Sequence, residues 1–347
     1  MPHSTLSRTL SVHRNPAASI APGRRHINQR LKKVIVSEYK ARFIELSDEE
    51  SGQRLDNYLM RVLSGVPKTR IYKAIRTGEV RVNKGRCKPE RKLVAGDVVR
   101  LPPMTIADPS VVKAIPDRWS SRIERSILYN DSQLMIVDKP TGLAVHGGSG
   151  VQFGLIESLR QMYPDQKYME LVHRLDRDTS GLVMIAKRAS ALRELHALLR
   201  DDGIDKRYFA LVSGKWPSHR VRVEASLQKS ALVSGERVVR VTSEGRRSVT
   251  DFRVIQRFRK ATLIEAKPIT GRTHQIRVHA QHAGHPIMGD LKYATEEQLA
   301  FAKTTGLKRL FLHAHQLRFR LGDRHHEFES ELDSELRGVC DSLSGNG

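Results

Sequence analysis

Cysteine is scarce in this sequence, and long apolar runs are missing from it. Cys87 and Cys340 are the only two cysteines among 347 residues, and a pair so far apart provides neither a disulfide framework nor the spacing of a zinc site. No apolar run approaches the roughly 20 residues needed to cross a bilayer, and the N-terminus lacks the apolar middle of a secretory signal. We therefore expect a protein of the reducing cytosol, without a membrane partner.

Aromatic and acidic residues are also few. Phe, Trp and Tyr make up 5% of the chain, which argues against a broad base-stacking surface. Lys and Arg number 60 against 38 Asp and Glu, a formal net charge of +22 at pH 7. This surplus favours a polyanion such as nucleic acid as the partner. It is dense near the N-terminus, since residues 51–102 alone hold thirteen Lys or Arg and four acids.

The first 42 residues contain no acid before Glu38 and show no sustained periodicity. This composition predicts that residues 1–42 form a mostly disordered basic arm. An Arg-rich N-terminus that is poor in acids also resembles a mitochondrial transit peptide. We favour the arm and keep the transit peptide as the alternative.

Residues 43–104 predict a compact basic module. One predicted helix contains RLDNYLMRVL, and a second, KTRIYKAIRTG, starts after Pro67 and ends at Gly78. The alternating segments VRVN and DVVRL predict short strands. Four basic side chains of the second helix point away from its apolar face and are expected to contact RNA phosphates: Lys68, Arg70, Lys73 and Arg76.

Prolines in residues 105–125 predict a linker, because proline breaks both helices and sheet ladders. Residues 126–340 then predict a larger unit in which strands outnumber helices. The predicted strands are SQLMIVDKP, GLVMIAKR, KRYFALVSG, VTDFRVIQRF and ATLIEAKPI, and the predicted helices are ALRELHALLR and RTHQIRVHAQHAG. The expected fold class is α+β, with a large mixed or antiparallel sheet.

Glycine and histidine are dense in two further stretches. DKPTGLAVHGGSG (138–150) lacks the spacing of a loop that binds nucleoside triphosphates. Its glycines are instead expected to let the backbone approach a neighbouring group closely. TGRTHQIRVHAQHAGHP (270–286) suggests a metal site through its histidines His274, His279, His282 and His285. Arg272 and Arg277 would repel a cation there, so we favour ordinary helix and turn roles or phosphate contacts, and no metal.

The stretch HRLDRDTSGL (173–182) places two carboxylates among arginines. Asp176 and Asp178 alternate with Arg174 and Arg177 between two apolar segments. A carboxylate that acts as base or nucleophile must stay ionised, and a nearby guanidinium favours the ionised form. By these residues alone, a catalytic loop and a structural salt-bridged loop are equally supported.

Four motifs in a fixed order carry a resemblance that decides between these alternatives. HRLDRDTSGL, KRYFALV, TGRTHQIRVH and LFLHA resemble the pseudouridine synthases of the RluA type, and residues 43–104 resemble an S4 RNA-binding domain. The resemblance covers residues 43–335. It implies a pseudouridine synthase domain at 126–340 that isomerises uridine in RNA without cofactor or metal, after the base has left its stack.

The resemblance also implies a role for individual residues. It assigns the catalytic carboxylate to Asp176 and makes Asp178 a holder of the loop. It implies that Arg174 occupies the space of the displaced base and that Tyr208 lies against the uracil, with a hydroxyl that can handle the proton at C5. It assigns to Arg272 the pairing with the catalytic carboxylate, and it leaves Arg277 without a role.

Two stretches indicate the substrate within the family. HGGSGVQFGLIESLR and SGERVVRV resemble the branch that modifies several uridines of bacterial 23S rRNA. We therefore expect a monomeric enzyme of the bacterial cytoplasm that acts on 23S rRNA or on an early assembly intermediate of the large subunit. The alternatives are the same chemistry on tRNA or other rRNA uridines, and a non-catalytic RNA-binding protein of ribosome assembly.

Overall fold

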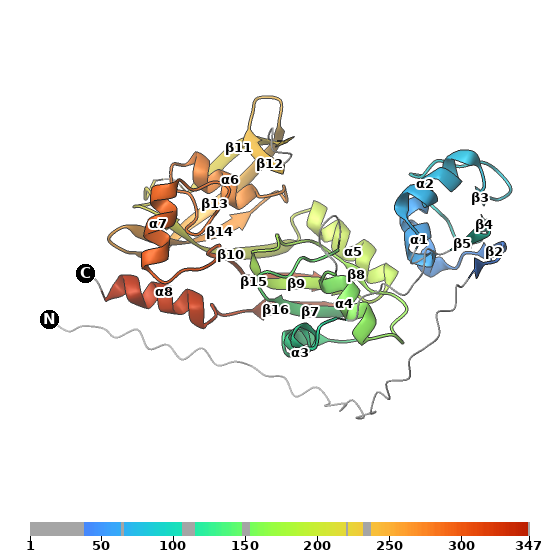
Figure 1. Cartoon of the computed structure of the whole chain (residues 1–347), viewed down its shortest axis with the longest axis horizontal. Coiled ribbons are helices and arrows are strands. Elements are labelled where there is room, and N and C mark those ends of the chain that lie inside the picture. Colours follow the sequence, from blue (N-terminus) through green and yellow to red (C-terminus); the bar gives the residue numbers. More distant parts are fainter. Residues whose placement is uncertain are drawn as a thin grey trace.

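The computed structural model describes residues 38–63, 66–105, 115–147, 153–219, 221–231 and 237–345. Figure 1 shows two units, a small one that contains α1 and α2 and a larger one built on an extended sheet. The expected basic arm lies outside the described residues up to position 37, and so do residues 148–150 of the glycine-rich stretch.

The small unit joins two helices and a three-stranded sheet around its own core. α1 (Leu55–Val62) and α2 (Lys68–Thr77) share buried apolar residues with the sheet β2–β4–β3. The other elements are β1 (Glu38–Tyr39), β2 (Arg42–Glu45), η1 (Asp48–Glu50), β3 (Arg81–Val82), β4 (Val98–Leu101) and β5 (Met104–Thr105). Gly78 closes α2 in the left-handed conformation, with φ 75°. The structure thus has the helices and short strands expected here.

The larger unit is built on one sheet with the strand order β12-β11-β13-β14-β10-β15-β9-β7-β6, to which β16 and β8 add at its sides. The strands are β6 (Ile127–Asn130), β7 (Leu134–Lys139), β8 (Glu170–Leu171), β9 (Ser180–Ala186), β10 (Ile204–Ser213), β11 (Arg222–Ala231), β12 (Arg237–Val241), β13 (Arg246–Arg257), β14 (Ala261–Pro268), β15 (Leu312–Leu321) and β16 (Arg324–Glu329). The large sheet expected from the sequence, and with it the α+β class, is confirmed.

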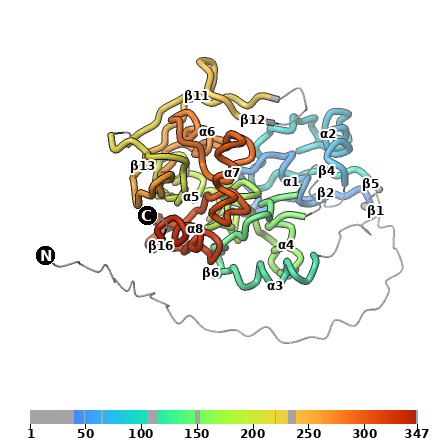
Figure 2. Tube along the Cα trace, turned by 60° about the vertical axis from the view of Figure 1, so that its left-hand side comes forward, coloured from blue at the N-terminus to red at the C-terminus, as the bar shows by residue number. Residues whose placement is uncertain are grey.

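Helices cover both faces of this sheet around β7 and β9. α3 (Asp117–Arg125) and α4 (Leu155–Met162) pack on one face, and α5 (Ala189–Arg200) packs on the other. The remaining helices are α6 (Gln275–His282), α7 (Glu296–Thr304) and α8 (Ser334–Ser344). α6 lies beside the strands β11 to β13, as Figure 2 shows. Every residue of β9 is buried as a result.

The second half of the expected linker is helical. α3 occupies Asp117–Arg125, and Ile123 is fully buried in the main core. The last of the prolines that suggested a linker is Pro116, which is the N-cap residue of this helix. Because proline is well tolerated at a helix start, its presence there did not exclude a helix beyond it. The earlier residues 106–114 lie outside the described part of the chain.

One junction in the sheet is parallel. β15 pairs with β9 through two register pairs, His313 with Ser180 and Ala314 with Gly181, while all other neighbouring strands are antiparallel. Gly181 has φ 108°, and a Cβ atom there would lie 2.3 Å from the Ala314 carbonyl oxygen. Only glycine allows the two strands to approach so closely, directly after the loop that carries Asp176.

The two units touch at Arg193 of α5 and at Tyr168. The Arg193 guanidinium donates a hydrogen bond to the Ser51 carbonyl oxygen, 3.1 Å away. Arg61 of α1 lies over the ring of Tyr168, 5.9 Å from its centre. Among the described residues, no helix has the length and apolar character required to span a membrane.

Candidate active site

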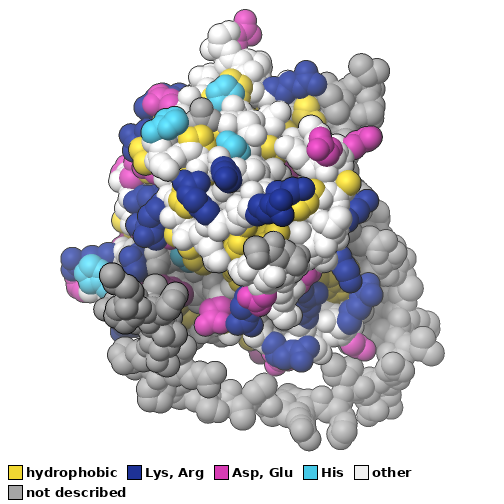
Figure 3. Space-filling model, turned by 90° about the vertical axis from the view of Figure 1, so that its left-hand side faces the viewer, with side chains coloured by type: hydrophobic (Ala, Val, Ile, Leu, Met, Phe, Trp, Pro, Cys, Tyr) yellow, Lys and Arg dark blue, Asp and Glu magenta, His cyan; other side chains and the backbone are white. Residues whose placement is uncertain are grey.

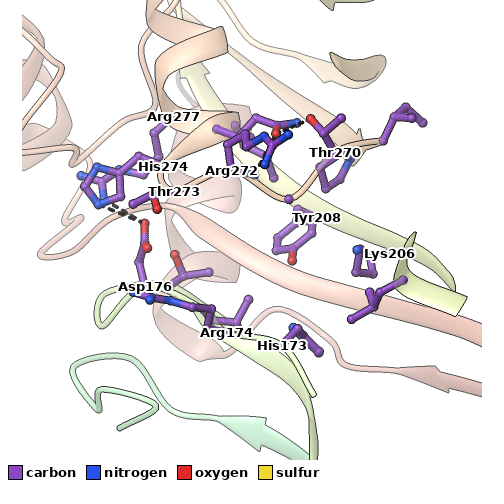
Figure 4. A pocket seen from close by; sticks show the side chains of 18 of the residues that line it. His173, Arg174, Asp176, Lys206, Tyr208, Thr270, Arg272, Thr273, His274 and Arg277 are labelled. Carbon is purple, nitrogen blue, oxygen red and sulfur yellow. Dashed lines mark hydrogen bonds and ion pairs between the residues drawn. The ribbon is translucent and has the colours of Figure 1, made fainter. Parts of the chain in front are cut away.

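A cavity of about 650 Å³ lies where the loop before β9 meets β10 and the start of α6. Figure 4 shows the labelled side chains around it, with Tyr208 between the two loops that carry Asp176 and Arg272. All four residues that the motifs assign to the reaction line it: Asp176, Tyr208, Arg174 and Arg272. The fold therefore brings together residues that lie up to about a hundred positions apart.

The Asp176 loop is supported from behind by the segment after β7. Lys139 is fully buried, and its ammonium group donates hydrogen bonds to three carbonyl oxygens, including that of Arg177 at 3.1 Å. Gly142 N donates to the same Arg177 oxygen, and the Thr141 hydroxyl donates to the Asp178 carbonyl. Burial lowers the pKa of Lys139 to about 7. This part of the glycine-rich stretch thus contacts the loop backbone, in agreement with an expected close backbone approach.

Arg277 is the arginine that holds Asp176. Its Nη1 donates to Asp176 Oδ2 at 3.1 Å, while its Nε and Nη2 donate to the two oxygens of Asp290 at 2.8 and 2.7 Å. The Arg277 side chain is 6% exposed and that of Asp290 is fully buried. Burial opposes the charge of Arg277, but the hydrogen bonds and charges of Asp290 and Asp176 outweigh it and raise its pKa. The guanidinium is thus a fixed positive charge at the floor of the cavity.

The pairing expected for Arg272 is therefore wrong. Arg272 lies on the exposed loop before α6, where its backbone N–H donates to Gln275 Oε1 at 3.0 Å. Figure 4 shows its guanidinium directed away from Asp176, and it forms no ion pair with any residue that the structure describes. The two arginines of RTHQIR differ because α6 begins at Gln275, which turns Arg277 into the interior and leaves Arg272 at the rim.

Tyr208 is buried in the middle of β10. Its side chain lines the cavity, and burial, assisted by the negative charge of Asp176, raises its pKa. The phenol is therefore neutral at physiological pH.

His173 and Lys206 also line this cavity, and the pKa values of both are lowered. Burial lowers the pKa of His173 to about 3, and its Nε2 accepts a hydrogen bond from Met184 N at 3.2 Å. Burial also lowers the pKa of Lys206. Arginines surround the cavity, and they are Arg174, Arg200, Arg247, Arg272 and Arg277. A polyanion is the ligand that suits such a rim.

Asp178, the second acid of the loop, has a different environment. Its carboxylate pairs with Arg177 at 3.1 Å, and both side chains are about half exposed. An exposed ion pair between neighbouring residues contributes little to the stability of the fold. The loop is held at this position by the Asp178 backbone carbonyl rather than by its side chain.

The histidines of 270–286 have separate partners. His279 is buried against Ser248 and Thr250, and His285 Nδ1 contacts the Ser213 carbonyl oxygen at 2.9 Å. His274 Nε2 lies 3.6 Å from Asp176 Oδ2. Sequence reasoning assigned no specific role to His274 or Arg277, and it missed Asp290. A signal for Asp290 was its isolation as an acid after the apolar run PIMG.

The basic face of α2 is partly engaged within the small unit. Arg70 forms an ion pair with Glu79, with Nη2 at 2.6 Å from Oε2. Lys68, Lys73 and Arg76 are exposed. Figure 3 shows the opposite end of the molecule, where Lys and Arg side chains are scattered rather than gathered into one patch. α2 therefore presents three exposed cationic side chains, those of Lys68, Lys73 and Arg76.

Comparison with known proteins identifies the two units. Residues 133–282 match the family described as RNA pseudouridylate synthase, and residues 53–99 match the S4 domain. The chain is 49% identical over 317 residues to ribosomal large subunit pseudouridine synthase C of Haemophilus influenzae, which covers 90% of this chain and 97% of that protein. It is 52% identical over 282 residues to the protein of the same name from Escherichia coli (strain K12), covering 80% and 88%.

A solved structure supports the assignment of the chain to this family. Human RNA pseudouridylate synthase domain containing 4 superposes with a TM-score of 0.54 at 25% sequence identity, and covers 65% of this chain and 96% of that one. The resemblance noted in the sequence motifs is thus confirmed for both units. The chain belongs to the family of RNA pseudouridylate synthases and is an enzyme of that family.

Proposed function

We propose that this enzyme converts uridines in the RNA of the large ribosomal subunit, 23S rRNA, into pseudouridines, with Asp176 as the catalytic carboxylate. The observation that carries the proposal is the carboxylate itself, paired with a buried arginine at the floor of a cavity with a basic rim. The names of the relatives, which share about half of their residues with this chain, support the large subunit as the source of the RNA.

The reaction moves a base without changing the atoms of the nucleotide. The bond from uracil N1 to ribose C1′ breaks, the ring turns, and C5 bonds to C1′; C5 then loses its proton and N1 gains one. Asp176 either attacks the nucleotide or removes a proton from the ribose. Both routes need an ionised carboxylate, and the adjacent guanidinium of Arg277 supplies the charge that favours it.

Tyr208 is proposed to support the uracil ring within the cavity. Its raised pKa keeps the hydroxyl protonated, so the group can relay a proton at C5 through its hydroxyl but does not act as a permanent phenolate. Arg174 is proposed to fill the space of the base that has left its stack, and Arg272 to contact phosphates at the rim. Both side chains are exposed beside the cavity, as these roles require.

The proposed substrate can be tested in cells. Deletion of the gene from its bacterial host is expected to remove more than one pseudouridine from 23S rRNA and none from the helix 69 loop, 16S rRNA or tRNA. Primer extension after carbodiimide treatment maps these positions. Loss of a tRNA pseudouridine alone, or of the helix 69 set, would assign the enzyme to another substrate. The proposed setting is the cytoplasm, with the enzyme acting as a monomer on free rRNA or early assembly intermediates.

The exposed cations of α2 are expected to supply affinity rather than chemistry. The triple substitution of Lys68, Lys73 and Arg76 with alanine should lower the slope of log affinity against log salt concentration by between about 2 and 3, because each lost phosphate contact removes roughly 0.7 to 0.9. Filter binding to 23S rRNA at several salt concentrations measures this slope.

Arg70 provides the matched control on the same helix. Since its guanidinium is already paired with Glu79, Arg70→Ala should change the slope less than any of the three single substitutions. The single-turnover rate at saturating RNA should stay near normal for all of these variants. An unchanged slope in the triple variant would show that this face of α2 does not meet RNA.

A further inference from the structure

The hairpin formed by β11 and β12 is connected to the region of Asp176 by hydrogen bonds. β12 is the outermost strand of the sheet, and Figure 1 shows the hairpin projecting from the body of the larger unit. Val239 of β12 donates its backbone N–H to the hydroxyl oxygen of Tyr293 at 3.0 Å. Tyr293 also packs with the small apolar cluster that contains Val239 and Val278. The position of β12 therefore bears directly on Tyr293.

Tyr293 contacts both groups that face Asp176. The guanidinium of Arg277 lies over its ring, 5.1 Å from the ring centre. Its hydroxyl lies 2.7 Å from His274 Nδ1, and His274 Nε2 lies 3.6 Å from Asp176 Oδ2. Figure 4 shows His274 and Arg277 on the same side of the Asp176 carboxylate.

The directions of these hydrogen bonds follow from the backbone donor. The Val239 N–H can only donate, so the Tyr293 oxygen accepts from it and the single hydroxyl hydrogen is left for His274 Nδ1. A neutral imidazole whose Nδ1 accepts must carry its proton on Nε2. Burial lowers the pKa of His274, which favours the neutral ring. The N–H of Nε2 then faces the carboxylate of Asp176.

His274 is also held in an unusual backbone conformation. It has φ 53° and ψ 18°, the left-handed region, at the N-cap of α6. This conformation is unfavourable for a residue with a Cβ atom and persists where its surroundings fix it. The hydrogen bond from Tyr293 is a contact that fixes the ring in this place.

We propose that Tyr293 is a positioning residue that fixes the tautomer of His274, so that a second N–H donor besides Arg277 faces Asp176, and that β12 sets this arrangement through Val239. The inference rests on the proposed catalytic role of Asp176. Displacement of β12 from Tyr293 frees its hydroxyl from the backbone donor, and the opposite tautomer of His274 then becomes accessible. The hairpin thereby couples its own position to the alignment of the catalytic carboxylate.

Tyr293→Phe tests the proposal, because it keeps the ring over Arg277 and removes only the hydroxyl. We expect the single-turnover rate at saturating RNA to fall about tenfold, as when one hydrogen bond to a charged group is weakened, while RNA affinity stays near normal. Nitrogen-15 spectra of histidine-labelled protein should show the Nε2–H tautomer of His274 in the wild type and its loss in the variant, with His274→Gln identifying the signal. Tyr129→Phe is the matched control, since it removes a hydroxyl that contacts Asp131 instead.

A double variant separates coupling from a general structural effect. If Tyr293 acts through His274, adding Tyr293→Phe to His274→Ala should lower the rate no further. Additive losses, a normal rate for Tyr293→Phe, or an Nδ1–H tautomer in the wild type would each overturn the inference. The wild-type spectrum decides the tautomer even if a variant folds poorly. An active Asp176→Asn enzyme would instead overturn the proposed function, so the two failures are distinguishable.

Discussion

Asp176→Asn is expected to abolish isomerisation while RNA affinity stays within a few-fold of the wild-type value. The amide keeps the shape of the side chain and removes the charge on which either route of the reaction depends. The fold should tolerate the change, because Arg277 keeps its two hydrogen bonds to Asp290. Release of tritium from RNA that contains 5-tritiated uridine measures the reaction. Substantial residual turnover would remove Asp176 from its proposed role.

Asp178→Asn is the matched control for this experiment. The two acids lie two positions apart in one loop, but the Asp178 carboxylate is half exposed and pairs with its neighbour Arg177. The loop contact at Asp178 comes from its backbone carbonyl, which the substitution retains. The variant should therefore keep most of its activity. Equal losses in both variants would indicate that the amides disturb the loop rather than the chemistry.

Arg277→Met is expected to lower the single-turnover rate by roughly a hundredfold or more, because it removes the buried positive charge that holds the catalytic carboxylate. It should also destabilise the protein by about 3–5 kcal/mol, because the buried carboxylate of Asp290 loses its positively charged partner and keeps only the hydrogen bond from Lys292 N. Rapid-quench kinetics and urea unfolding measure the two effects separately.

A second substitution can separate stability from catalysis. In Arg277→Met with Asp290→Asn, no unpaired charge remains beneath the site, so stability should largely return while the rate stays low. Arg272→Met is the matched control, since the same residue change at the exposed rim should weaken RNA binding and leave the rate at saturating RNA near normal. If Arg272→Met impaired the chemical step more than Arg277→Met, the pairing seen in the structure would not be the one used in catalysis.

The sequence predicted the elements of the larger unit well where periodicity was strong. GLVMIAKR begins with a continuous apolar run and ATLIEAKPI is rich in apolar residues, and they form β9 and β14 in the interior of the sheet. α3 was not predicted, because prolines in a segment indicate a break in secondary structure, although proline is tolerated at the start of a helix. The parallel junction of β9 and β15 was beyond prediction, since it joins strands that no local pattern connects.

The site was predictable as a set of residues but not as a set of contacts. The motifs placed Asp176, Tyr208, Arg174 and Arg272 at one cavity, where the structure has them. The choice between Arg272 and Arg277 depended on where α6 begins, and helix boundaries are the least certain feature of a sequence pattern. Asp290 and Tyr293 lie outside the motifs, and the isolation of Asp290 as an acid does not show that it pairs with Arg277; these contacts follow from burial in the folded chain.

The parallel junction between β9 and β15 also bears on when a newly made chain can become active. β15 lies between β9 and β10 in the sheet, and its contact with β9 joins Ser180 to His313, 133 residues further on. A nascent chain that ends before β15 contains Asp176, Tyr208 and Arg277. It lacks the strand that brings Asp176 beside Tyr208 and Arg277. Contacts between residues so far apart in the sequence also slow folding. Activity therefore requires that β15 has been made and has paired with β9.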